Sequence, residues 1–322
     1  MKKILFATSE AVPFIKTGGL ADVAGSLPKC FDKKYFDIRV ILPKYACMKQ
    51  EWKDKMEYVT HFYMSTGSYI QNKYVGVLQY ELDGIKYYFI DNQEYFDSFL
   101  PYGNVRYDIE KFCFFDKAVL SMLPLIGFKP DIIHCHDWQT GLIPVYLKNE
   151  FQGDMFFWGI KSIMTIHNLK FQGVWDIETM QGLTGLNDSF FTPDKLEFQE
   201  DANMLKGGLV YADYITTVSD TYAQEIQTAY YGEGLDGLLS ARHMDMQGIV
   251  NGIDYDEYNP ETDPMLVHNY SPYNFRTEKV HNKTALQQEL GLPEHLGSTG
   301  LLQALNLLMT REEFQHRYGE LR

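Results

Sequence analysis

The run Ile4-Leu5-Phe6-Ala7-Thr8 and the turn Lys16-Thr17-Gly18-Gly19-Leu20 open the chain and decide its fold class. The apolar run has the length of a buried strand, and the segment from Leu20 to Cys30 after the turn is expected to be a helix. A strand, a glycine turn and a helix in this order begin a doubly wound α/β sheet. The sequence therefore predicts a Rossmann-like domain.

Further strand candidates alternate with helical segments along the chain. Apolar side chains recur at near-helical spacing at Ile109, Phe112, Val119 and Met122, which indicates a helix that faces the core. Strands that alternate with helices predict a parallel sheet. The other predicted strands are residues 38–42, 131–134, 161–166, 214–218 and 248–250.

An inserted β-hairpin is predicted where residues 74–82 and 85–90 flank Asp83-Gly84, because this dipeptide suits the positive φ of a two-residue turn. After residue 250 the chain becomes rich in Asp, Asn, Tyr and Pro, which indicates a linker. Three segments are expected. They are a Rossmann-like domain over residues 1–250, a linker with a helix at 277–290 over residues 251–293, and a tail over residues 294–322 with a joint at 297–300 and a final helix.

Composition excludes several classes of protein. The formal charge of −14 over 322 residues argues against a general binder of nucleic acid or of anionic membranes. The four cysteines form no C-x-x-C pair, so neither a disulfide framework nor a cysteine zinc site is predicted, and a reducing, cytoplasmic location fits. The apolar run that ends at Ala7 is too short for a signal peptide.

The first candidate site is the glycine turn. Gly18 and Gly19 let backbone N–H groups approach a phosphate, the next helix adds a favourable dipole, and Lys16 adds a positive charge. An ordinary turn that caps a helix is the alternative interpretation. A dinucleotide site is disfavoured, because the next glycine is Gly25 and the second strand closes with Pro43-Lys44, where an NAD site needs an acidic residue.

The second candidate is His134-Cys135-His136-Asp137-Trp138 at the end of a predicted strand. Strand alternation puts both histidines on one side. A metal site needs three or four converging ligands, and two histidines supply at most half of them, so no metal is expected. Trp138 has two interpretations, as a core residue or as a surface on which a sugar ring stacks.

Later polar segments are less specific. His167 after a strand is either a satisfied structural residue or a ligand contact, and the neutral amides of Asn168 and Gln172 favour a hydroxyl-rich ligand. Asp254 and Asp256 have a D-x-D spacing, which we interpret as a solvated capping stretch more readily than as a cation site. The segment Lys206-Gly207-Gly208 is interpreted as a site of close packing.

Taken in order, these motifs resemble the family of bacterial glycogen synthases and plant starch synthases, from Met1 to about Pro293. The resemblance implies two facing Rossmann-like domains of GT-B type. It also implies transfer of glucose from ADP-glucose to the non-reducing end of an α-1,4-glucan such as glycogen or maltodextrin, with retention and without a metal or another cofactor. The motifs are residues 16–23, 136–138, 165–169 with 172–173, 211–213 and 251–254.

The resemblance also implies roles for single residues. Lys16 and the amides of Gly18 and Gly19 would face the donor diphosphate. The glucose site would be lined by four residues, which are Asp22, Asp137, His167 and Asn251. Asp137 and Trp138 would shape the acceptor side, and the loop around them would be supported by Asn168 and Gln172. Lys16, Asp137 and His167 are the expected catalytic residues.

Two features depart from the family pattern. Gln139-Thr140 stands where many members carry other residues after the Asp-Trp pair, which we interpret as harmless variation. A second domain of similar size is expected after the linker, and the sequence after Pro293 does not resemble it; Glu312 and Glu320 match an E-x7-E spacing only by coincidence. The chain is therefore expected to be a truncated glucosyltransferase whose activity alone is open. A non-catalytic glucan- or sugar-nucleotide-binding module on the same fold is the alternative, and a transferase that uses UDP-glucose is a third interpretation.

Overall fold

The computed structural model describes residues 1–98 and 100–293. The chain divides into two compact units, of which the first is Met1–Asn251 and the second begins at Gly252. The joint expected at 297–300 and the helix expected at 301–322 lie outside the described residues.

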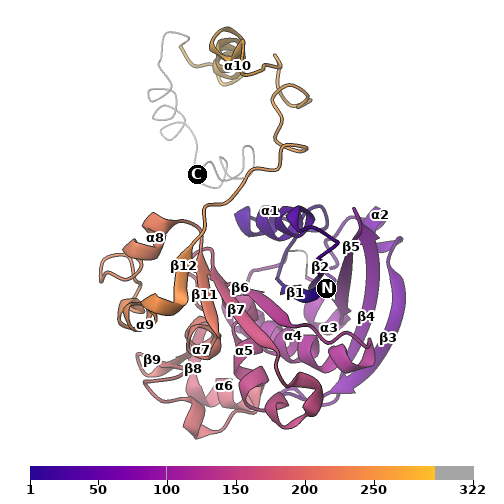
Figure 1. The fold of residues 1–322 in the computed structure, drawn as a ribbon, viewed down its shortest axis with the longest axis vertical. Helices are drawn as coiled ribbons and strands as arrows, with labels where there is room; N and C mark the ends of the chain where they lie inside the picture. The colour runs from indigo at the N-terminus through magenta and orange to yellow at the C-terminus, as the bar shows by residue number, and fades with distance from the viewer. Residues whose placement is uncertain (99, 294–322) are drawn as a thin grey trace. The chain divides into compact units, whose positions relative to one another are not determined.

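The first unit is built on a nine-stranded sheet with the order β12-β11-β7-β6-β1-β2-β5-β4-β3 (Figure 1). Every neighbouring pair from β12 to β5 is parallel, and helices alternate with these strands along the chain, which confirms the predicted fold class. The parallel strands are β1 (Lys2–Ala7), β2 (Phe36–Pro43), β5 (Ile85–Asp91), β6 (Ile132–His136), β7 (Lys161–Ile166), β11 (Tyr214–Thr217) and β12 (Met246–Gly248).

The predicted hairpin is present and extends this sheet. Asp83 (φ 53°) and Gly84 (φ 70°) form the two-residue turn between β4 (Lys73–Leu82) and β5. Because β5 also pairs in parallel with β2, the hairpin continues the main sheet instead of standing apart from it. A further antiparallel strand, β3 (Glu57–Met64), forms the edge, and the sequence analysis missed it because none of its residues is buried.

Two helices confirm the sequence pattern that predicted them. Helix α1 (Gly19–Ser26) follows the glycine turn and gives way to a 3-10 turn over Leu27–Cys30, where Pro28 lacks the N–H that an α-helix needs. Helix α4 (Val105–Leu125) is capped at its start by Asn104, whose side chain accepts a hydrogen bond from the backbone N–H of Tyr107.

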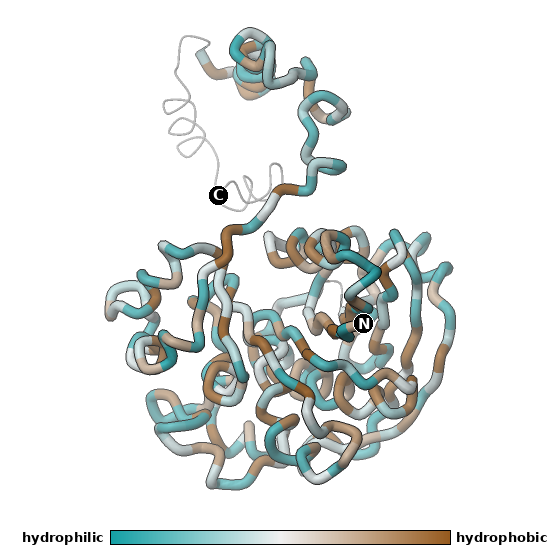
Figure 2. Tube along the Cα trace, viewed as in Figure 1, coloured by the Kyte–Doolittle hydropathy of each residue, from teal (hydrophilic) through white to brown (hydrophobic). Residues whose placement is uncertain are grey.

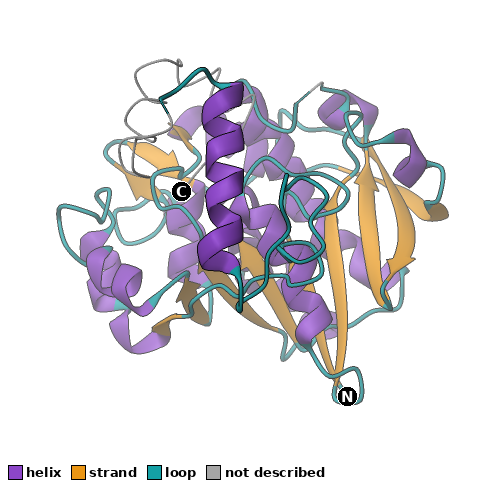
Figure 3. Ribbon diagram, turned by 90° about the horizontal axis from the view of Figure 1, so that it is seen from above, coloured by secondary structure: helices purple, strands orange, loops and turns teal. Residues whose placement is uncertain are grey.

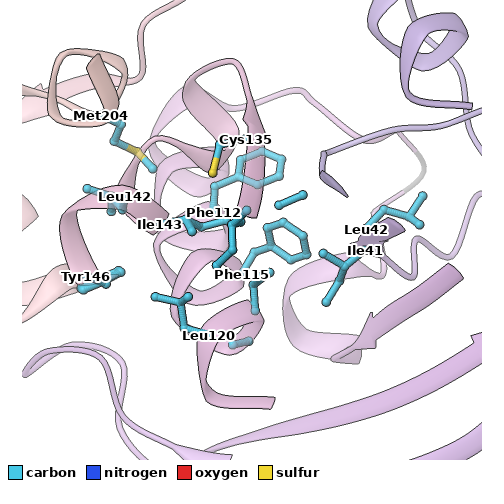
Figure 4. Close-up of a cluster of buried hydrophobic side chains, with 14 of the residues drawn as sticks. Ile41, Leu42, Phe112, Phe115, Leu120, Cys135, Leu142, Ile143, Tyr146 and Met204 are labelled. Carbon is cyan, nitrogen blue, oxygen red and sulfur yellow. The ribbon is translucent and has the colours of Figure 1, made fainter. Parts of the chain in front are cut away.

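Helix α4 packs against α5 (Leu142–Lys148), and α5 packs against α7 (Met204–Tyr211). Figure 4 shows aromatic side chains of α4 beside aliphatic side chains of α5 and β2. A Cβ atom on Gly208 would lie 3.0 Å from the carbonyl oxygen of Gly141, so the glycine lets the two segments approach. This contact confirms the packing role that the sequence predicted for the glycines of α7.

The remaining elements of the first unit surround the sheet. Figure 2 shows hydrophobic stretches in strands and in helices of this unit, and Figure 3 shows the helices, strands and loops in a second view. None of the described helices is long and apolar enough to cross a membrane. These elements are α2 (Gln50–Lys53), α3 (Gln93–Phe96), α6 (Ile177–Thr184), α8 (Asp220–Glu225), α9 (Asp236–Ala241) and a small antiparallel sheet of β8 (Val174–Asp176), β10 (Asp201–Asn203) and β9 (Glu197–Phe198).

In the second unit, residues 252–274 form turns without a strand or helix, as expected of a linker. Helix α10 (Phe275–Glu289) follows, and its bounds agree with the predicted helix to within two residues at its start. The carboxylate of Asp254 accepts a hydrogen bond from the backbone N–H of Asp256 at 3.1 Å, as the capping interpretation of this segment expects.

Candidate active site

Three neighbouring strands bring the predicted site residues together. β1, β6 and β7 are adjacent and parallel, so the segments that leave their carboxyl ends emerge at the same edge of the sheet. The segment after β1 leads to the glycine turn, the segment after β6 begins with Asp137, and the segment after β7 begins with His167. Loops that meet at this edge are where open α/β sheets bind ligands.

The glycine turn is held by a buried carboxylate that the sequence analysis did not single out. Glu10 is 3% exposed, and it accepts hydrogen bonds from the backbone N–H of Thr17, from Oγ1 of Thr17 at 2.9 Å and from the hydroxyl of Tyr102 at 3.2 Å. Burial raises the pKa of Glu10, and the hydrogen bonds from Thr17, Tyr102 and the N–H of Gly18 oppose that shift. The only signal in the sequence was an acidic residue directly after a strand.

Neither backbone conformation nor packing against the described residues requires glycine at the two glycine positions of the turn. Gly18 has an extended backbone (φ −156°, ψ −168°), and a Cβ atom on Gly18 or Gly19 would meet no atom within 4 Å. Gly25 contrasts with them, because a Cβ atom there would lie 2.4 Å from the carbonyl oxygen of Val12. No side chain caps the start of α1. The N–H groups of Thr17 and Gly18 are engaged by Glu10, so the part of the turn that is open to an anion begins at Gly19, where the helix N-terminus has no side-chain cap.

Lys16 and Asp22, two of the predicted site residues, form an ion pair beside this turn. Nζ of Lys16 lies 2.8 Å from Oδ1 of Asp22, and both side chains are partly exposed. Because Asp22 belongs to the first turn of α1, the contact places the lysine charge next to the helix N-terminus.

Asp137 joins the loop after β6 to the loop after β7. Oδ1 of Asp137 accepts hydrogen bonds from the backbone N–H of His167 at 2.7 Å and of Asn168 at 3.3 Å. The backbone of Asp137 has φ 56° and ψ −174°, a conformation that costs about 1–3 kcal/mol for a residue other than glycine. Such strain is common at functional sites, and here the surrounding hydrogen bonds maintain it.

Three histidines lie close to these loops: His134 and His136 belong to β6, and His167 directly follows β7. The rings of His134 and His136 stack at 4.3 Å on the same side of β6, as predicted, and both pack against Phe6 of β1. Nδ1 of His136 lies 2.9 Å from Nε2 of His167. Burial lowers the pKa of His134 to about 3 and also lowers the pKa of His136 and of His167, so all three imidazoles are neutral near pH 7.

The structure gives no support for a metal centre formed by these residues. Among residues 1–98 and 100–293, no three His, Cys, Asp or Glu side chains lie close enough together to hold a metal ion.

Trp138 lies in the core beneath the loop after β7. It is 8% exposed, and its ring meets Phe112 edge to face at 5.3 Å. Gly173 has φ 64°, and a Cβ atom on it would lie 2.4 Å from the indole ring. The stacking of a sugar on Trp138 therefore stays a prediction, since most of the ring is occupied by protein contacts.

Gln172 uses both ends of its amide to support this loop. Nε2 of Gln172 donates to the carbonyl oxygens of Leu169 at 3.0 Å and Glu233 at 3.1 Å, and Oε1 accepts from Asn203. Oδ1 of Asn168 accepts from the backbone N–H of Lys170 at 3.1 Å. Both amides thus form hydrogen bonds within the loop, and their predicted role in binding substrate stays a prediction.

Asn251 is the last residue of the first unit, three residues beyond β12, and it is exposed. Within the part of the chain that the structure describes, no hydrogen bond joins Asn251 to the other site residues. Its predicted place at the glucose site stays a prediction.

Comparison with known proteins identifies the family of the chain. Residues 3–241 match the family model of the starch synthase catalytic domain. The chain is 62% identical to a glycogen synthase of Lachnospira eligens over 92% of this chain and 62% of that protein. It is 49% identical to a glycogen synthase of Geobacillus stearothermophilus over 91% of this chain and 59% of that protein.

A solved structure supports the fold as well. The catalytic domain of Starch Synthase IV from Arabidopsis thaliana, bound to ADP and acarbose, is 31% identical and superposes with a TM-score of 0.79, covering 92% of this chain and 60% of that one. This chain therefore spans about three fifths of the length of the relatives that it matches. Sequence motifs, sheet topology and these matches agree that the chain belongs to the starch synthase catalytic domain family, which comprises glycosyltransferases of glycogen synthase type.

Proposed function

We propose that this chain binds the diphosphate of ADP-glucose at the glycine turn and takes part in transferring glucose, with retention, to the non-reducing end of an α-1,4-glucan. The observation that carries the proposal is the pair Gly18 and Gly19, because a Cβ atom on either would meet no atom within 4 Å and neither packing nor φ requires glycine there. An incoming phosphate needs such an approach, because a Cβ atom would separate it from the N–H groups.

The charges around the turn fit this role. The helix N-terminus and Lys16 would stabilise the negative charge that grows on the departing ADP, and the Glu10 carboxylate would keep the turn in place for it. His167 and Asp137 would contact or shape the site of the transferred glucose, together with Asp22 and Asn251. No cofactor enters the proposal, and the free cysteines fit a reducing cytoplasmic location.

The domain assignment belongs to the same proposal. Residues 1–250 would form the catalytic domain that carries the donor turn, and residues 251–293 would form the linker and the start of a second domain. The related starch synthase IV domain was solved with ADP and acarbose, which supports a nucleotide and a glucan as the two ligand classes to test first.

Two measurements on the purified chain test the proposal. Calorimetric titration with ADP-glucose, and with UDP-glucose as a competitor donor, measures binding, and transfer of radiolabelled glucose to maltoheptaose measures catalysis. Saturable binding that ADP competes away, with transfer, supports the full proposal. Binding without transfer favours a non-catalytic sugar-nucleotide-binding module. A chain that binds neither donor contradicts the proposed role of the turn.

A further inference from the structure

The contact between His136 and His167 requires one shared proton. Nδ1 of His136 and Nε2 of His167 are 2.9 Å apart, and both imidazoles are neutral because burial lowers their pKa values. A neutral imidazole has one N–H and one lone pair. Either His136 donates through Nδ1, or His167 donates through Nε2. In the first arrangement the remaining nitrogen is a lone pair on His136 and an N–H on His167, and in the second arrangement these are exchanged.

The surroundings of His136 select the first arrangement. Nε2 of His136 is buried and has no hydrogen-bond partner, and the ring is enclosed by the stacked rings of Phe6 and His134. If His167 were the donor, the proton of His136 would sit on Nε2 as a buried N–H without an acceptor, which is rare in folded proteins. If His136 donates through Nδ1, its Nε2 is a bare lone pair and no buried N–H is left unpaired.

The charge of Asp137 selects the same arrangement independently. Its carboxylate accepts the backbone N–H of His167 at 2.7 Å, so a negative charge lies close to the backbone of His167, and this charge acts on the imidazole in the direction that raises its pKa. Nδ1 is the ring nitrogen nearest the backbone. A proton on Nδ1 is attracted by that charge, whereas a lone pair on Nδ1 is repelled by it.

We propose that His136 is a positioning residue that donates its Nδ1 proton to Nε2 of His167 and thereby fixes His167 as a hydrogen-bond donor at Nδ1. The lone pair of His167 is then occupied by His136, so His167 cannot act as a general base. Nδ1 of His167 forms no hydrogen bond within the described residues, and His167 is half-buried, so its N–H is available to a ligand.

The ligand group that fits this N–H is an acceptor oxygen, such as a sugar hydroxyl. That part of the inference rests on the proposed function, whereas the assignment of the tautomer does not. His136 does not touch the ligand and acts through His167 alone.

The tautomers are measured directly by long-range ¹H–¹⁵N correlation spectra of the chain labelled at histidine, near neutral pH. We expect both His136 and His167 to carry the proton on Nδ1 and to show an unprotonated Nε2. Assignment comes from single substitutions. If the spectrum of the unmodified protein shows a proton on Nε2 of His167, or on both of its nitrogens, the proposal is overturned. This outcome does not depend on the behaviour of the variants.

His136→Phe tests the causal link, because phenylalanine keeps a flat ring beside Phe6 and His134 but removes the donor. We expect His167 to lose its fixed Nδ1–H tautomer in His136→Phe and to keep it in His136→Asn, which retains an N–H. His61→Gln, at an exposed position of β3, is the control and should leave His167 unchanged. A folded His136→Phe protein with an unaltered His167 tautomer overturns the link.

Ligand affinity separates this inference from the proposed function. We expect His136→Phe to weaken ADP-glucose binding about tenfold, the effect of one hydrogen bond, and to leave ADP binding nearly unchanged, because ADP lacks the glucosyl hydroxyls. Equal losses for both ligands overturn the assigned ligand group. If the unmodified chain binds neither ligand, the proposed function fails while the tautomer assignment is still decided by the spectra.

Discussion

The carboxylate of Asp137 accepts the backbone N–H of His167 at 2.7 Å, and this single contact ties the loops that follow two neighbouring strands of the sheet. The same carboxylate also accepts the N–H of Asn168. Two residues that are 30 positions apart in the sequence are thereby held in one geometry, and a strained backbone at Asp137 is maintained.

Asp137→Ala is expected to lower the free energy of unfolding by about 1–3 kcal/mol, because two backbone N–H groups lose a charged acceptor. Asp137→Asn keeps an acceptor oxygen and should cost less. Urea denaturation measures both values. The control is Asp32→Ala, which removes an exposed carboxylate that accepts the N–H of Lys34 at 2.8 Å. An equal decrease in the free energy of unfolding for Asp137→Ala and for the control would show that the hydrogen bonds between the two loops contribute nothing to stability.

Alanine substitutions in and after the glycine turn should separate binding from stability. Gly18→Ala and Gly19→Ala are expected to leave the free energy of unfolding unchanged or to raise it by up to about 1 kcal/mol, since their Cβ atoms meet open space. Both should weaken ADP binding tenfold or more, because the methyl group occupies the approach of the phosphate.

Gly25→Ala is the matched control for these variants. Its Cβ atom would lie 2.4 Å from the carbonyl oxygen of Val12, so we expect a loss of about 1–3 kcal/mol in stability. Thermal melts and calorimetric titration with ADP measure the two properties. Unchanged ADP affinity in both Gly18→Ala and Gly19→Ala would remove the turn from the phosphate site.

Lys16→Ala is expected to weaken ADP binding strongly and to change stability by no more than about 0.5 kcal/mol, because its ion pair with Asp22 is partly exposed and screened by solvent. Added salt should lower the ADP affinity of the parent protein more than that of the variant, since the lysine charge is one source of the salt dependence. Lys2→Ala, at the far end of β1, removes a similar surface charge and should leave ADP binding unaltered.

The buried imidazole of His134 should make stability fall in acid. Burial lowers its pKa from 6.5 to about 3, so below pH 6.5 the unfolded chain binds a proton at His134 that the folded chain does not. The unfolded state therefore binds more protons in this window, and stability decreases by about 1.4 kcal/mol for each pH unit below 6.5 until about pH 3.

Comparison with His134→Phe isolates this contribution. The buried carboxyls of Glu10 and Asp116 have raised pKa values and act with the opposite sign, but they are present in both proteins and cancel in the difference. The stability advantage of the parent over the variant should shrink by about 2 kcal/mol between pH 6.5 and about pH 5. Urea unfolding at a series of pH values measures it, and a difference that is constant with pH contradicts the prediction.

Local sequence patterns were sufficient for the central part of the fold. The apolar runs of β1, β2, β6, β7 and β11 predicted the parallel strands, because a strand buried on both faces must be apolar along its length. The dipeptide Asp83-Gly84 predicted the hairpin, since its residues accept positive φ at low cost. The ordered motifs at the strand ends predicted the family. Each of these signals lies within a few neighbouring residues.

The sequence by itself did not reveal β3, the role of Glu10 or the contact of His136 with His167. β3 has no buried residue and therefore no apolar pattern, and its place at the edge is set by pairing with β4. Glu10 and Tyr102 form a hydrogen bond although they are 92 positions apart in the sequence. His136 and His167 are 31 positions apart, and the register of β6 with β7 brings them together. Such partners are chosen by packing and strand pairing over long sequence separations, so only the tertiary structure decides which atoms meet.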